Sequence, residues 1–127
     1  MKQILSNDII NQYMPTLVKC PLFNTLGEPE LRSYLNNAKV IIHSYQKNDF
    51  IALAGDPMEG IGVILEGSAL LTRENVMGQR VIMANLEQSD IFGEALLFSK
   101  QPLWPATIKA TKATKIMFIP LETFIKT

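Results

Sequence analysis

The chain has 127 residues, of which 47% are hydrophobic and 19% are charged, a composition typical of one globular domain rather than of a disordered segment. Its 12 basic and 12 acidic residues cancel and no basic run stands out, which argues against a nucleic-acid-binding surface in this chain. The single cysteine, Cys20, excludes an intramolecular disulfide and a four-thiolate iron–sulfur cluster.

Two sequence features bear on the compartment. No apolar run reaches the roughly 18 residues that a membrane-spanning helix needs. The N-terminus becomes polar too early for a signal peptide. We therefore expect a cytoplasmic protein.

Two short amphipathic helices are predicted near the N-terminus, between about residues 6 and 37. The first is capped at Ser6, presents an apolar face that includes Tyr13, and ends or bends at Pro15. The second begins beside Pro29, because proline suits the first helical position.

From about residue 39 to about residue 119 the hydrophobic period changes to two, which predicts about eight short strands. The expected strands are 40–45, 50–53, 62–67, 69–73, 80–86, the segment that ends at Gly93, 106–111 and 113–119. Turns rich in Gly, Asn, Asp and Pro separate them. This pattern favours a mainly β single domain over residues 1–127, a jelly-roll β-barrel (double-stranded β-helix) with flanking helices, the last of which begins at about residue 120.

The stretch from Ile91 to Ala110 is the candidate site. It joins a strand end, a turn at Gly93, a short helical turn over Glu94–Phe98 and a further strand. The free amides of such a helix start suit an anion, because they lack intrahelical partners and the helix dipole adds positive potential. The sequence therefore predicts a pocket for a small anionic effector.

Four segments carry a resemblance to a known family. They are Gly55-Asp56-Pro57, Val63-x-Leu65-x-Gly67, Asp90-x-Phe92-Gly93-Glu94 and Ala106. At these spacings the chain resembles, from about Cys20 to Ile119, the cyclic-nucleotide-binding domain of the catabolite-activator and fumarate–nitrate-regulator (Crp/Fnr) family of bacterial transcription regulators. The resemblance implies a jelly-roll sensor domain that binds a small-molecule effector and acts allosterically.

The resemblance also implies a ligand site. Its phosphate-binding-cassette-like residues are Phe92, Gly93, Glu94, Ala95, Trp104, Pro105 and Ala106. Leu71, Met83 and Ala84 would line its apolar side. In the family, the amides around Gly93 hold the phosphate and the residue at Glu94 binds the ribose 2′-hydroxyl.

This chain departs from the family pattern at two cassette positions. The family has Arg followed by Ser or Thr where this sequence has Trp104 and Pro105. An indole cannot neutralise a phosphate, and proline has neither a hydroxyl nor an N–H. Two or three charge-assisted bonds of roughly 1.5–3 kcal/mol each are absent, which predicts cAMP affinity weaker by about two to five orders of magnitude. Lys109 lies on the outward-facing side of its strand, so we expect no replacement from it.

Several residues have a second interpretation. Trp104 either fills the vacated pocket, which we favour because buried aromatic residues mostly pack, or stacks on a ligand. Glu94 either binds the ligand or caps the short helix. His43, the only histidine, could be a haem or metal ligand, although metal sites need three or four ligands.

The functional prediction is an effector-sensing domain of a Crp/Fnr-type transcription regulator that does not bind cAMP in the standard way. The alternatives are a ligand-free β-roll module for dimerisation or protein interaction, and a cyclic-nucleotide binder with unusual contacts. No enzyme, metal or firm cofactor is predicted, because a single imidazole limits both metal binding and nucleophilic catalysis. Pro120–Thr127 reads as a helix cut after two turns, so DNA binding through a helix-turn-helix domain and homodimerisation are expected only in a longer protein.

Overall fold

The computed structural model describes residues 2–4, 6–23, 25–94 and 103–120 of the chain. Within them the chain forms two helices, α1 (Asn7–Leu17) and α2 (Glu28–Asn37), and nine strands. The strands are β1 (Lys2–Ile4), β2 (Ile41–Tyr45), β3 (Phe50–Ala52), β4 (Gly60–Glu66), β5 (Ala69–Glu74), β6 (Arg80–Leu86), β7 (Ile91–Phe92), β8 (Thr107–Ala110) and β9 (Thr114–Pro120).

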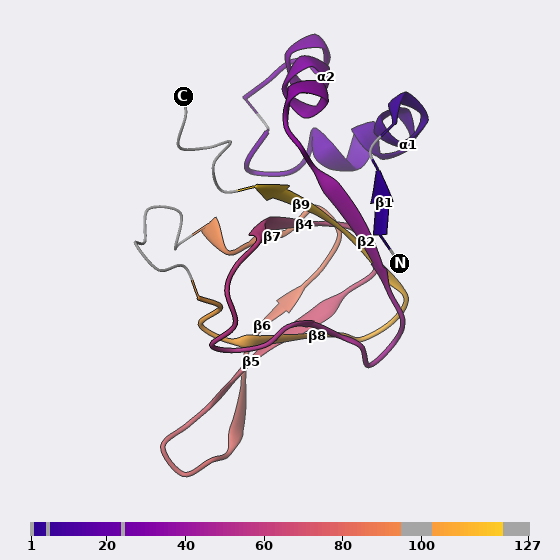
Figure 1. The fold of residues 1–127 in the computed structure, drawn as a ribbon. Coiled ribbons are helices and arrows are strands. Elements are labelled where there is room, and N and C mark those ends of the chain that lie inside the picture. Colours follow the sequence, from indigo (N-terminus) through magenta and orange to yellow (C-terminus); the bar gives the residue numbers. More distant parts are fainter. Residues whose placement is uncertain (1, 5, 24, 95–102, 121–127) are drawn as a thin grey trace.

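The strands form two antiparallel sheets that face each other (Figure 1). One sheet has the order β1-β2-β9-β4-β7, and the other has the order β3-β8-β5-β6. The predicted mainly β architecture is confirmed, with the two predicted N-terminal helices beside it. The helix predicted from about residue 120 lies outside the described residues. Strand β1 was not predicted, because its three residues are held by pairing with β2 rather than by a pattern of their own.

Helix α1 continues past Pro15, the residue at which the sequence predicted that it ends or bends. Ser6 caps it, and its Oγ accepts a hydrogen bond from the N–H of Ile9 at 3.3 Å. The helix does not end at Pro15 but continues to Leu17. A helical hydrogen bond and tertiary packing both hold the last turn. Val18 N–H donates to the carbonyl of Met14 at 3.0 Å, and Leu17 is fully buried.

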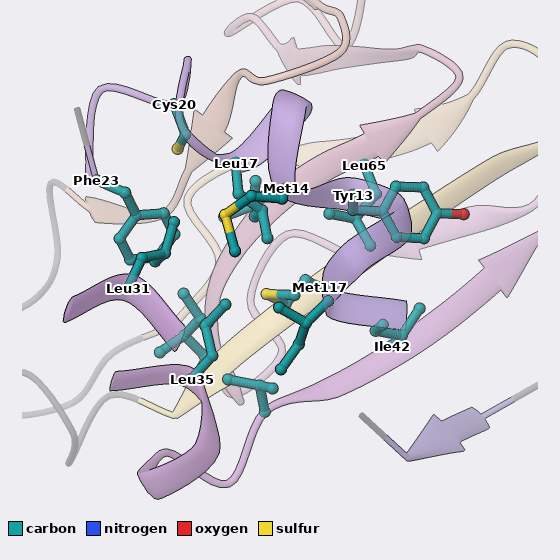
Figure 2. Close-up of a cluster of buried hydrophobic side chains, with 14 residues drawn as sticks. Tyr13, Met14, Leu17, Cys20, Phe23, Leu31, Leu35, Ile42, Leu65 and Met117 are labelled. Atoms are coloured by element: carbon teal, nitrogen blue, oxygen red, sulfur yellow. The ribbon is translucent and has the colours of Figure 1, made fainter. Parts of the chain in front are cut away.

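The two helices cover the outer face of the five-stranded sheet and form an outer core with it (Figure 2). Its buried residues are Ile10, Tyr13, Met14, Leu17, Cys20, Phe23, Leu31, Leu35, Val40, Ile42, Val63, Leu65, Met117 and Ile119. Cys20 is fully buried there, and burial raises the pKa of its thiol. Cys20 therefore packs as a small hydrophobic side chain.

A second, inner core fills the space between the two sheets. Its buried residues are Ala52, Met58, Ile64, Ala69, Leu86, Phe92, Trp104, Ile108, Ile116 and Phe118. Neighbouring residues of β4 and β9, such as Val63 and Ile64, therefore point into different cores. A central strand that is covered on both faces needs a nearly continuous apolar sequence, and both strands have one.

No helix in the described ranges is long and apolar enough to span a membrane.

Tyr13 at the edge of the outer core should make the domain less stable as the pH rises through the alkaline range. Its hydroxyl donates a hydrogen bond to Oε2 of Glu66 at 2.8 Å. Burial, the hydrogen bond and the charge of Glu66 raise the pKa of Tyr13 above its ordinary value to about 12. A folded-state pKa above the unfolded value contributes stability that is complete below about pH 10 and is lost as the pH rises towards about 12.

We therefore expect Tyr13→Phe to lose less stability than the parent between about pH 9 and about pH 11.5. Urea unfolding midpoints at the two pH values measure this. Tyr45, whose pKa is also raised to about 12, titrates in both proteins and cancels in the comparison. Equal losses in the parent and the variant would contradict the assignment.

Candidate functional site

The site begins where β7 ends at a sharp turn. Phe92 pairs with Gly62 of β4, and the chain then turns at Gly93 with a φ of +95°. A Cβ at this position would lie 2.9 Å from Cε of Met58 and 3.3 Å from the ring of Trp104. Glycine is thus required both by the backbone conformation and by the close approach of two side chains. The exposed Glu94 follows directly, and the rest of the predicted helical turn, Ala95–Phe98, lies outside the described residues.

A cavity of about 280 Å³ lies against this turn, and we call it the cassette cavity. Predicted site residues that line it are Leu71, Ala84, Phe92, Gly93, Glu94, Trp104, Pro105 and Ala106. Leu86, Ile91 and Ile108, which the sequence analysis did not assign to the site, complete the lining. The structure therefore brings together residues from β5, β6, β7 and the turn after it, the segment before β8, and β8 itself.

Two predicted site residues are not in this lining. Ala95 lies outside the described residues. Met83 is 52% exposed and lies away from the cavity. The reason is strand alternation: Ala84 and Leu86 of β6 line the cavity, and Met83, as the neighbour of Ala84, lies on the other face of the strand. A β-bulge also interrupts the pairing here, since Leu71 pairs with Ala84 but Thr72 pairs with Ile82.

Trp104 is packed into the inner core and is 7% exposed. Its ring centre lies 5.7 Å from that of Phe92, with the planes tilted by 40°. Its backbone is fixed by the predicted Gly-Asp-Pro turn: Trp104 N–H donates to the carbonyl of Asp56, and Gly55 N–H donates to the carbonyl of Trp104, both at 2.8 Å. The indole forms one wall of the cassette cavity without filling it.

The lining of the cassette cavity is apolar and carries little charge. Among the residues that the structure describes, Glu94 is the only charged side chain that lines it. Lys109 points outward as expected, with Nζ 5.6 Å from the ring centre of Phe50. Arg73 of β5 is not among the described lining residues, but it lies beside the cassette, since its Nε donates to the carbonyl of Pro105 at 3.1 Å. Its position near the cassette depends on the pairing of β5 with β8, so no pattern along the chain could have revealed it.

His43 shows no sign of a metal site. Its ring packs edge-on against Phe118, with centres 5.6 Å apart. No group of three or more His, Cys, Asp or Glu side chains in the described part of the chain is placed to hold a metal ion.

Comparison with known proteins gives a consistent result. The sequence model of the cyclic nucleotide-binding domain matches residues 42–127. The cAMP-activated global transcriptional regulator CRP of Pasteurella multocida is 31% identical over 97 residues, which are 76% of this chain and 46% of that protein. The chain spans less than half the length of the curated relatives that it matches.

Solved structures show the same fold. The sensor domain of the transcriptional regulator DNR from Pseudomonas aeruginosa has a TM-score of 0.79 at 18% identity, covering 94% of this chain and 78% of that one. The catabolite activator protein of Thermus thermophilus has a TM-score of 0.73 at 24% identity, covering 84% of this chain and 48% of that one. These likenesses identify the jelly roll that the strand pattern predicted.

Proposed function

Since the chain belongs to the cyclic nucleotide-binding domain family, we propose that it is the effector-sensing domain of a Crp/Fnr-type transcription regulator. We propose further that it does not bind cAMP in the standard way. The observation that carries the proposal is the lining of the cassette cavity. A site that holds a cyclic phosphate needs positive charge where the phosphate lies, because charge-assisted bonds supply much of the binding energy.

The cavity supports a different kind of ligand. Trp104 and Pro105 stand where the family pattern has Arg and Ser or Thr, and both line the cavity. Among the described residues, the one charged lining group, Glu94, is negative. Among the described lining residues a phosphate would find no cationic side chain, whereas an apolar ligand that donates a hydrogen bond to Glu94 would meet complementary groups.

In this proposal the domain acts by allostery in a cytoplasmic regulator. The effector shifts the equilibrium between two arrangements of the protein only if it binds one arrangement better than the other. DNA binding and dimerisation are assigned to other parts of such a regulator. No catalysis is proposed.

A second candidate function is a ligand-free β-roll that serves dimerisation or protein contact. Its support is the packing of Trp104 against Phe92 and the two backbone hydrogen bonds that fix Trp104 to the Gly55–Asp56 turn. Trp104 held in this way needs no ligand to fix its position.

Thermal shift with millimolar cAMP and cGMP tests the proposal. We expect no shift for the parent protein and a clear shift for the double variant Trp104→Arg, Pro105→Ser. Restoring two or more charge-assisted bonds should raise cAMP affinity by at least about a hundredfold. The matched control is Trp104→Leu, Pro105→Ser, which also removes the indole but adds no charge and should not respond.

The outcomes separate the two candidate functions. A clear shift for the parent would contradict the proposal. Silence from every variant, with circular dichroism showing that each is folded, would favour the ligand-free module. A shift of the Arg-containing variant alone would show that the pocket persists and that its preference rests on the two substituted positions.

A further inference from the structure

A second cavity, of about 290 Å³, lies beside strands β2 and β3. We call it the β2–β3 cavity. Trp104 lines it as well as the cassette cavity. Its walls are rich in aromatic side chains: Tyr45, Phe50, Phe118 and the indole of Trp104, with His43 packed edge-on against Phe118. A hollow lined by several aromatic side chains is the typical setting for recognising an organic cation.

The charged side chains in the described part of this lining are all negative. Asp56 and Glu59 contribute two carboxylates to its lining, and no Lys or Arg belongs to that set of residues. Burial is the main cause that raises the pKa of Tyr45 to about 12. The negative charges of Glu59 and Asp49 raise it further, so these carboxylates act on a phenol of the cavity lining. An anion would therefore be repelled from the cavity.

The same walls argue against a metal ion. Aromatic carbons offer no ligand atoms, and no group of three or more metal-binding side chains occurs in the described part of the chain. The domain already shows the attraction between an ammonium group and this aromatic surface, since Nζ of Lys109 lies 5.6 Å from the ring centre of Phe50. Lys109 itself is not part of the lining.

We propose that the β2–β3 cavity binds a small organic cation of the alkylammonium class, with the ammonium group between the aromatic walls and the carboxylates of Asp56 and Glu59. The volume suits a ligand smaller than a drug-sized molecule. This site is separate from the cassette cavity and does not depend on the effector proposed there.

Trp104 is the only tryptophan of the chain, so its fluorescence reports on the cavity directly. The probe is choline, titrated at constant ionic strength, with its neutral isostere 3,3-dimethyl-1-butanol as the matched ligand. Isothermal titration calorimetry repeats both titrations, so that a silent fluorophore does not decide the result. We expect saturable binding of choline in the millimolar range and binding of the neutral alcohol that is weaker by about tenfold.

Three variants locate the binding site. Glu59→Gln and Phe50→Leu change exposed side chains, and each should weaken choline binding by about three- to tenfold. Glu94→Gln removes a carboxylate from the cassette cavity and should leave choline binding unchanged. The proposal is overturned if neither method detects saturable choline binding, if the neutral isostere binds equally well, or if Glu94→Gln weakens binding while Glu59→Gln does not.

Discussion

Replacing Gly67 by alanine is expected to lower the free energy of unfolding by about 2–5 kcal/mol, because two separate costs add. Gly67 has a φ of +98°, in the left-handed region that side chains disfavour by about 1–2 kcal/mol. A Cβ there would also lie 2.5 Å from the carbonyl oxygen of Ala113 and 2.6 Å from Cα of Thr114. Overlap with backbone cannot be relieved by a rotamer change, so it adds about 1–3 kcal/mol.

The close approach at Gly67 is itself held by hydrogen bonds. Ser68 N–H donates to Oγ1 of Thr114 at 3.2 Å, and the same hydroxyl donates to the carbonyl of Lys112 at 2.8 Å. These bonds tie the β4–β5 connection to the β8–β9 connection, so the backbone at Gly67 has little freedom to move away. The free energy of a whole domain is only about 5–15 kcal/mol, and Gly67→Ala would remove a large part of it.

Gly78→Ala is the matched control. Gly78 also has a positive φ, +78°, but a Cβ there would meet nothing within 4 Å. It should therefore cost only the conformational term, about 1–2 kcal/mol. Urea unfolding at neutral pH measures both variants. Equal losses at the two glycines would show that steric contact at Gly67 is not the dominant cause.

Phe92→Ala is expected to lower the free energy of unfolding by about 3–5 kcal/mol, the range for removing a large buried aromatic side chain. Phe92 is 3% exposed, and its ring centre lies 5.7 Å from that of Trp104 and 6.0 Å from that of Phe118. The ring also lies directly over Gly62, whose missing side chain makes room for it. Its loss would leave a void at the junction of the inner core and the cassette cavity.

Phe50→Ala is the matched control, because it makes the same truncation at an exposed phenylalanine. Phe50 is 50% exposed, so the same truncation should cost about 1 kcal/mol. Chemical denaturation with identical fitting gives both values. A loss at Phe92 that is no larger than the loss at Phe50 would contradict the inner-core position assigned to Phe92.

The strands illustrate how far local information reaches. The expected segment 62–67 is observed as Gly60–Glu66, and the expected segment 106–111 as Thr107–Ala110. Alternation and turn residues are local properties, so they reveal that a strand exists, while its ends are set by partners. Strand β1 shows the limit, since three residues become a strand only through pairing with β2.

In the cassette, too, local sequence revealed some features and missed others. Gly93 and its turn were predicted, and Ala106 and Ile108 alternate as expected towards the interior. Met83 and Ala84 were both assigned to the lining, although neighbouring residues of a strand point to opposite faces, and only Ala84 lies in it.

By itself, the sequence determined the family resemblance, the order of helices and strands, and the two substituted cassette positions, Trp104 and Pro105, because residue identity and short-range periodicity carry that information. Only the tertiary structure decided that Trp104 is a wall shared by two cavities, that the Gly55–Asp56 turn holds its backbone, and that Gly67 is confined while Gly78 is free. These facts depend on groups that are distant along the chain and adjacent in space, and their positions follow from the packing of the two sheets.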